Sequence, residues 1–202
     1  MKGDNHKAEF DSQDGRRVLL RPLRMKDIGS CLLFANTLVK ERRTNLDLGI
    51  ISFDRRVTRK EEMKFLRTIV RDRSKGDAVN VAAFIGDKLV GNCDIRRRKA
   101  KDERHCGVFG IVILDGHRGI GIGERMMAEA LREARALGIW LVELTVFASN
   151  LPAIQLYKKM GFRRAGFVPG KIIRGDRHYD EVMMYADLRG SDKSTKNRRR
   201  KS

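Results

Sequence analysis

The feature that most constrains this chain is a glycine-rich loop between a strand-like run and a helix-like run. It reads Ile111-Val-Ile-Leu-Asp-Gly-His-Arg-Gly-Ile-Gly-Ile-Gly-Glu124, and an apolar face at helical spacing follows it, made of Met127, Ala130, Leu131 and Ala134. Backbone N–H groups in the first turn of a helix have no partner within the helix and lie at the positive end of its dipole. The loop is therefore predicted to bind a phosphate or pyrophosphate.

Three kinds of phosphate-binding loop can be compared with these residues. A nucleotide-triphosphate loop requires Gly-x4-Gly-Lys-Ser/Thr, and no Lys-Ser/Thr follows the glycines. A dinucleotide fingerprint requires Gly-x-Gly-x-x-Gly, and its third position falls on Glu124 or Met126, although Glu143 lies about where a ribose-binding acid would. The third form, Arg/Gln-x-x-Gly-x-Gly, is matched by Arg118-Gly-Ile-Gly121-Ile-Gly123. Taken alone, the glycines also suit a flexible turn between a strand and a helix.

A second segment distinguishes these forms. Trp140–Val146 is rich in β-branched and apolar residues and predicts a strand. After it, Ser149 or Asn150 can cap a helix that Gly161 ends. The two segments together resemble the GCN5-related N-acetyltransferase (GNAT) superfamily, over roughly residues 17 to 188. In that family Arg/Gln-x-x-Gly-x-Gly holds the pyrophosphate of acetyl-CoA, and an Asn…Ala-x-x-x-Tyr…Gly-Phe segment forms the far wall of the cofactor slot.

The resemblance implies a mixed α/β fold. We expect a central, mostly antiparallel sheet that is splayed between its fourth and fifth strands and flanked by helices on both faces. The residue patterns predict the order β-αα-βββ-α-β-α-ββ. It includes a strand at 17–22, a helix from Ile28 capped by Asp27, a second helix behind the capping box Thr58-Arg-Lys-Glu61, and last strands at 163–168 and 181–185. Gly86-Asp87 is predicted to be a hairpin turn.

Charge and polarity suggest the domain limits. The 202 residues carry a formal net charge of +18, and residues 189–202 contribute seven Lys or Arg against one Asp. We expect a mobile N-terminal lead-in over residues 1–16, a single acetyltransferase domain over 17–189, and a disordered basic tail over 190–202. The tail could contact RNA, the ribosome or another polyanion, or it could be a solvated segment with no specific role.

The remaining composition points to a soluble cytoplasmic protein, either a monomer or a homodimer. The chain shows no signal-peptide pattern and no apolar run of membrane-spanning length, so no membrane contact is expected. Its three scattered cysteines, Cys31, Cys93 and Cys106, are typical of reduced thiols, and no Cys/His spacing suggests a metal site.

The resemblance implies that acetyl-CoA is the co-substrate and assigns residues to it. The backbone of Arg118, Gly119, Ile120, Gly121, Ile122 and Gly123 would hold the pyrophosphate, and the Arg118 side chain either adds charge there or lies in solvent. In the preceding strand, Ile111 and Ile113 stand where family members pair their backbone with the pantetheine arm and direct an N–H at the thioester oxygen. Asn150 would cap its helix and contact the cofactor.

Tyr157 is the first candidate for a catalytic residue, because a neutral phenol can donate its proton to the departing thiolate. Its position on an apolar stripe also suits a packed aromatic side chain. The general base is less defined, since Gly107 and Thr145 occupy the two positions where family members carry a glutamate. Glu143 acting through water, His105, and bulk water without protein assistance remain alternatives.

The amine acceptor cannot be deduced from these residues. The region where the superfamily places it offers Asn45, Asp47, His178, Tyr179, Asp180 and Glu181, and the last two could attract a cationic amine. Three functions remain open: acetylation of a protein amine (a Lys or an N-terminus), acetylation of a small amine or amino acid, and an RNA- or ribosome-associated binding protein that keeps the acetyltransferase fold.

Overall fold

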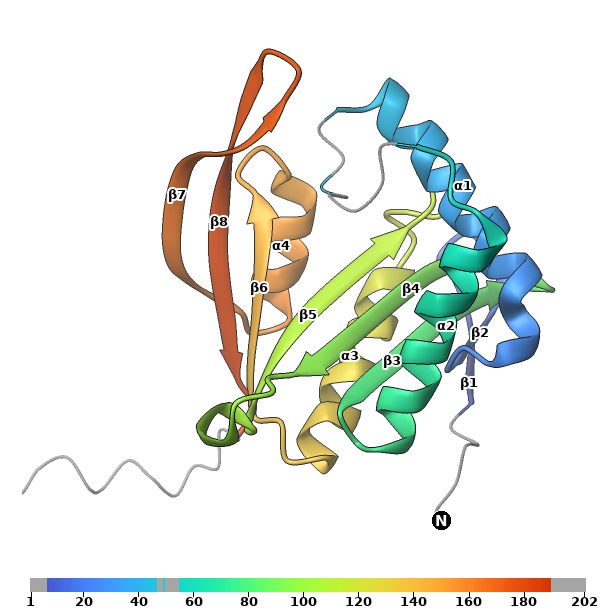
Figure 1. Cartoon of the computed structure of the whole chain (residues 1–202), viewed down its shortest axis with the longest axis horizontal. Coiled ribbons are helices and arrows are strands. Elements are labelled where there is room, and N and C mark those ends of the chain that lie inside the picture. Colours follow the sequence, from blue (N-terminus) through green and yellow to red (C-terminus); the bar gives the residue numbers. More distant parts are fainter. Residues whose placement is uncertain (1–6, 47–48, 50–54, 190–202) are drawn as a thin grey trace, which may run out of the picture.

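A computed structural model describes residues 7–46, 49 and 55–189 and is built around a sheet of eight strands (Figure 1). The strands lie in the order β1-β2-β3-β4-β5-β6-β8-β7. Neighbouring strands are antiparallel except β5 and β6, which are parallel. Their bounds are β1 Ala8–Asp11, β2 Arg17–Arg21, β3 Ala78–Ile85, β4 Lys88–Arg97, β5 Cys106–Ile113, β6 Leu141–Phe147, β7 Arg163–Arg174 and β8 Arg177–Asp187.

Helices cover both faces of this sheet (Figure 1). One face carries α1 (Ile28–Thr44) and α2 (Arg59–Ser74), and the other carries α3 (Ile122–Ala136) and α4 (Leu151–Lys159). Side chains alternate across a strand, so β3 supplies both cores: Val79, Val81 and Ala83 pack on the α3 side, whereas Ala82 and Phe84 pack on the α1 side. Across the described ranges, no helix has the length and hydropathy needed to cross a membrane.

The sheet opens between β5 and β6. These two strands are paired only from Cys106 opposite Leu141 to Val108 opposite Glu143, and beyond that point they diverge (Figure 1). This is the splayed, mostly antiparallel sheet that the resemblance implies. This is the predicted break between the fourth and fifth strands; these are β5 and β6 here because the additional strand β1 precedes the others.

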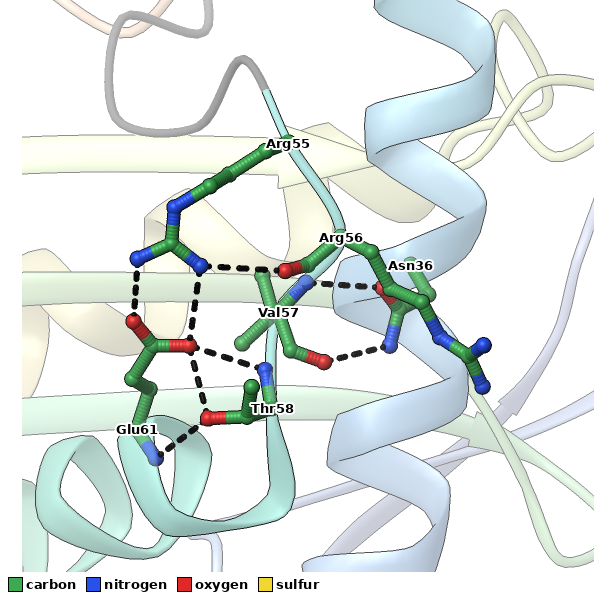
Figure 2. Close-up of polar contacts among 6 residues, drawn as sticks. All are labelled: Asn36, Arg55, Arg56, Val57, Thr58 and Glu61. Carbon is green, nitrogen blue, oxygen red and sulfur yellow. Dashed lines mark hydrogen bonds and ion pairs between the residues drawn. The ribbon is translucent and has the colours of Figure 1, made fainter.

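The entrance to α2 is fixed against α1, as Figure 2 shows. The Asn36 side chain of α1 accepts a hydrogen bond from the Val57 N–H at 2.9 Å and donates one to the Val57 carbonyl at 3.1 Å. Thr58 and Glu61 form the predicted capping box, and Arg55 donates to Glu61 at 2.6 Å. The start of α2 is therefore held to α1 by hydrogen bonds between the Asn36 side chain and the Val57 backbone, as well as by the apolar faces of the two helices.

Three sequence-based expectations need correction. Residues 8–11 do not belong to a mobile lead-in, because β1 pairs with β2 and Phe10 packs against the core. Asp27 precedes α1 but makes no capping bond to it; its carboxylate accepts hydrogen bonds from the Arg24 N–H and the Arg21 guanidinium. The last two strands are longer than predicted, since an irregularity between Val168 and Ile172 accommodates Pro169 and Gly170 without ending β7.

Candidate functional site

A cleft of about 480 Å³ lies where β5 and β6 diverge. It collects residues from β5, the glycine loop, the end of β6, the start of α4 and the turn between β1 and β2. The lining residues are Gln13, Gly49, Phe109–Ile113, Arg118, Gly119, Gly121, Gly123, Glu124, Thr145–Phe147, Asn150, Pro152, Ala153, Leu156 and Tyr157. The two segments singled out in the sequence are thus the two walls of one cleft.

The glycine loop leaves the first amides of α3 open to a ligand. Gly121 stands at the N-cap of α3 with no side-chain cap, and its φ of +88° is one that residues with a side chain rarely adopt. Gly123 has an ordinary φ, but a Cβ there would lie 3.2 Å from both Ile113 Cδ1 and Leu156 Cδ2. Glycine at 121 therefore shapes the turn, and glycine at 123 lets the helix start close to the cleft walls.

The Arg118 side chain braces the loop. Its Nε donates to the Ile113 carbonyl at 2.7 Å, and its guanidinium pairs with Glu41 of α1 at 2.5 Å. Glu41 also accepts a hydrogen bond from the Asp115 N–H at 2.8 Å. Arg118 therefore holds the loop to the end of β5 and to α1. Sequence reasoning missed Glu41, because no local pattern links it to a loop more than seventy residues away.

The turn between β1 and β2 supports the loop from the other side. The Gln13 N–H donates to the Ile120 carbonyl at 3.1 Å, and Arg16 contacts the Gly116 carbonyl at 2.9 Å and His117 Nδ1 at 2.8 Å. Burial and the Arg16 charge lower the pKa of His117, so its neutral ring can accept this hydrogen bond. Gln13 and Arg16 were also missed, since the polar composition of the first sixteen residues suggested a mobile segment.

The four predicted isoleucines take different positions. Ile111 and Ile113 line the cleft, whereas Ile120 packs partly buried against the core and Ile122 is fully buried. On the side facing β6, strand pairing stops at Val108, so the backbone of residues 109–113 has no partner strand there. This open edge suits a ligand with amide groups, which could bind along β5 as a strand would.

The start of α4 forms the opposite wall. The Asn150 side chain accepts a hydrogen bond from the Ala153 N–H at 3.2 Å, which confirms its role as a helix cap. Tyr157 is 7% exposed, and its ring meets Phe109 edge-on at 6.3 Å between centroids. Burial, with a smaller effect of Cys93, raises the pKa of Tyr157 to about 12. The phenol therefore keeps its proton at neutral pH and can act only as a donor of that proton.

Glu143 and His105, the two candidates for a general base, do not line the cleft. Glu143 lies in the short stretch where β6 is still paired with β5, and Arg98 Nε donates to its carboxylate at 2.7 Å. His105 precedes β5 and stacks on Trp140 at 4.2 Å between ring centroids. Both residues are at the closed end of the splayed strands, opposite the glycine loop. Glu124 is the single carboxylate among the described lining residues, and Lys159 pairs with it at 2.7 Å.

The region expected to hold the acceptor lies beside the end of β6. Asn45 follows the last turn of α1, and Asp47 lies outside the described residues. Phe147 stacks on Tyr179 at 5.0 Å, and the Arg174 guanidinium lies 4.7 Å from the centre of the Phe147 ring. Among the described residues, no group of three or more His, Cys, Asp or Glu side chains is placed to hold a metal ion.

Comparison with known proteins agrees with this geometry. The sequence model of the acetyltransferase (GNAT) family matches residues 49–162, which is more than half of the chain. The chain belongs to this family. It is 31% identical to an L-amino acid N-acetyltransferase of Escherichia coli over 105 residues, which are 52% of this chain and 64% of that protein. The chain spans less than two thirds of the length of the curated relatives that it matches.

Solved structures share the fold over most of the chain. A GNAT-family acetyltransferase from Streptococcus pneumoniae superposes with a TM-score of 0.74 at 27% identity, covering 85% of this chain and 99% of that one. A phosphinothricin acetyltransferase from Sinorhizobium meliloti, solved in complex with acetyl-CoA, gives a TM-score of 0.72 at 19% identity and covers 85% and 88% of the two chains.

Proposed function

We propose that this protein is an acetyl-CoA-dependent N-acetyltransferase that transfers the acetyl group to a primary amine by direct attack in a ternary complex. The observation that carries the proposal is the single cleft that joins the open amides of the glycine loop, the unpaired edge of β5 and the buried phenol of Tyr157. Acetyl-CoA supplies an activated thioester; the protein must hold it, stabilise the developing oxyanion and move protons.

The residues present fit this co-substrate. The amides from Gly119 to Gly123 hold the pyrophosphate, and Arg118 keeps the loop in shape instead of adding charge from its own side chain. The free backbone edge of β5 at Ile111 and Ile113 binds the pantetheine arm and directs an N–H toward the thioester oxygen. Because the loop offers backbone amides and no bulky side chains, a pyrophosphate can approach closely.

Tyr157 is proposed as the general acid. Its raised pKa keeps the hydroxyl protonated, and it lines the same cleft as β5 and the glycine loop, so it can donate a proton to the sulfur as the thiolate leaves. The second proton of the amine nitrogen, which is released as the amide forms, restores the phenol through water. The amine gives up its own proton to water before it attacks, since neither Glu143 nor His105 lines the cleft and Glu124 is paired with Lys159. An unassisted deprotonation of the bound acceptor predicts that kcat rises with pH until the amine of the bound acceptor is neutral.

We propose a small amine, such as an amino acid, as the acceptor. The support comes from the names of relatives: one is an L-amino acid N-acetyltransferase, and a neighbour of the same fold is a phosphinothricin acetyltransferase. A protein amine is the competing acceptor class, and it would need an open surface beside the cleft.

The test is a screen for release of free CoA thiol from acetyl-CoA with amino acids, amino acid amides, polyamines and lysine-containing peptides. Turnover with small amines and not with peptides supports the proposal. Turnover with peptides alone would assign a protein acceptor. No turnover with any amine, together with salt-dependent binding to RNA, would instead favour a basic RNA-binding protein that keeps this fold.

A further inference from the structure

Strand β8 contains two buried polar side chains, Tyr179 and Glu181, that have no hydrogen-bond or ion-pair partner among the described residues. Tyr179 and Glu181 are each 7% exposed. The Tyr179 hydroxyl makes no hydrogen bond, and within the described residues no donor or cation pairs with the Glu181 carboxylate. Burying a hydroxyl away from water without a partner is costly, so Tyr179 needs an explanation. The Glu181 carboxylate oxygens are not among the fully buried unpaired atoms, so they remain open to a ligand.

Both side chains stand beside the cleft. Glu181 is directly opposite Phe147 in the β6–β8 ladder, and directly paired residues project to the same face of a sheet. Phe147 lines the cleft, as does Thr145 two residues earlier on the same face. Tyr179, two residues before Glu181, shares this face and stacks on the Phe147 ring. The unpaired carboxylate and hydroxyl therefore flank the end of the cleft formed by β6.

The neighbouring acid has a different role. Asp180 projects to the opposite face, and its Oδ1 accepts a hydrogen bond from the Gly170 N–H at 2.8 Å, which closes the irregular stretch of β7. Arg174 lies over both the Phe147 and Tyr179 rings and donates to the Leu46 carbonyl at 2.5 Å. The structure thus separates the two adjacent acids: Asp180 stabilises the hairpin, and Glu181 is left for a ligand.

We propose that Glu181 and Tyr179 form the subsite that binds the ammonium group of the acceptor. This inference rests on the proposed function and names the part of the acceptor that is recognised. An ammonium group is a compact cation with three N–H donors; the Glu181 carboxylate neutralises its charge and accepts one hydrogen bond, and the Tyr179 oxygen accepts a second. The subsite selects acceptors that arrive as cationic primary amines, and it rejects neutral analogues that leave the carboxylate unpaired.

The experiment compares three variants with the wild type. Glu181→Gln removes the charge and keeps the shape, Tyr179→Phe removes the hydroxyl, and Asp187→Asn is the control, because it removes a carboxylate of β8 that pairs with Arg189 at the surface. Acetyl-CoA affinity is measured by calorimetry, and steady-state kinetics use the best primary amine from the acceptor screen. A second readout is inhibition by that acceptor with its amine replaced by a hydroxyl.

We expect Glu181→Gln to raise the KM for the amine by about tenfold or more, the usual size of a hydrogen bond to a charged group, and to leave acetyl-CoA affinity within about twofold. The preference of the wild type for the amine over its hydroxyl analogue should shrink toward one, which a purely structural role of Glu181 would not cause. Tyr179→Phe should raise the KM less, and Asp187→Asn should not change it. An unchanged KM and an unchanged preference in Glu181→Gln overturn the subsite while the proposed function stands. A wild type that neither acetylates nor binds any amine overturns both.

Discussion

Tyr179→Phe should stabilise the protein, although most substitutions of buried residues destabilise. The change deletes a hydroxyl that is buried without a hydrogen-bond partner and keeps the ring that stacks on Phe147 at 5.0 Å. An unsatisfied buried polar group costs about 1–3 kcal/mol, and a small part of this gain is lost with the contacts of the oxygen atom itself. We therefore expect the free energy of unfolding to rise by about 1 kcal/mol, which corresponds to about 2–4 °C in melting temperature for a chain of this length.

The assay is thermal unfolding of the protein without ligands, followed by circular dichroism at neutral pH. Tyr185→Phe is the matched control, because Tyr185 lies on the same strand but is only partly buried, and its change should stay within about 0.5 kcal/mol. A lower melting temperature in Tyr179→Phe than in the wild type would show that the hydroxyl has a partner in solution, and the reasoning about this strand would then be wrong.

Three further predictions concern the cleft and the helix pair. Tyr157→Phe should lower kcat by about 10²-fold with little change in acetyl-CoA affinity, since a general acid acts in the transition state; near-normal turnover would assign the proton to water. Gly121→Val should weaken acetyl-CoA binding by at least about tenfold, because a β-branched residue is strained at a φ of +88° and would distort the turn that presents the amides; unchanged affinity in calorimetry would contradict the assignment of the loop. Glu62, 5% exposed on α2, has its pKa raised by burial from 4.5 to about 7, so its favourable contribution to stability is complete below about pH 4.5 and is lost as the pH rises through 7. Glu62→Gln should therefore raise the melting temperature more at pH 8 than at pH 5, and equal shifts at both pH values would rule out this ionisation.

The local parts of the fold were predictable from the sequence. The capping box at Thr58, the cap at Asn150 and the hairpin turn at Gly86 all appear as predicted, and α3 starts at Ile122, within the glycine loop. Each depends on residues fewer than about five positions apart, where backbone geometry and side-chain type decide the structure.

The contacts that complete the site were not predictable in this way. Glu143 and Thr145 share a face of β6, but the strands diverge between them, so Thr145 lines the cleft and Glu143 pairs with Arg98. The ion pair between Arg118 and Glu41 joins residues that are far apart in the sequence. The same is true of the hydrogen bond from the Gln13 N–H to the Ile120 carbonyl. Such pairs are set by how the layers pack, which no local pattern contains.

Residues outside the segment that matches the family hold the glycine loop in place, so that segment alone should not bind acetyl-CoA. The segment that matches the family, residues 49–162, contains the whole loop and Tyr157 but lacks Gln13, Arg16 and Glu41, which hold the loop in place. It also lacks β8, which is the strand that pairs with β6 on the side away from β5. A fragment cut to those limits would keep every signature residue and lose the shape that makes them bind. During synthesis, Gln13, Arg16 and Glu41 are made long before the glycine loop that they hold, and β8 is made last. The part of the cleft that binds the cofactor can therefore assemble before the part that binds the acceptor.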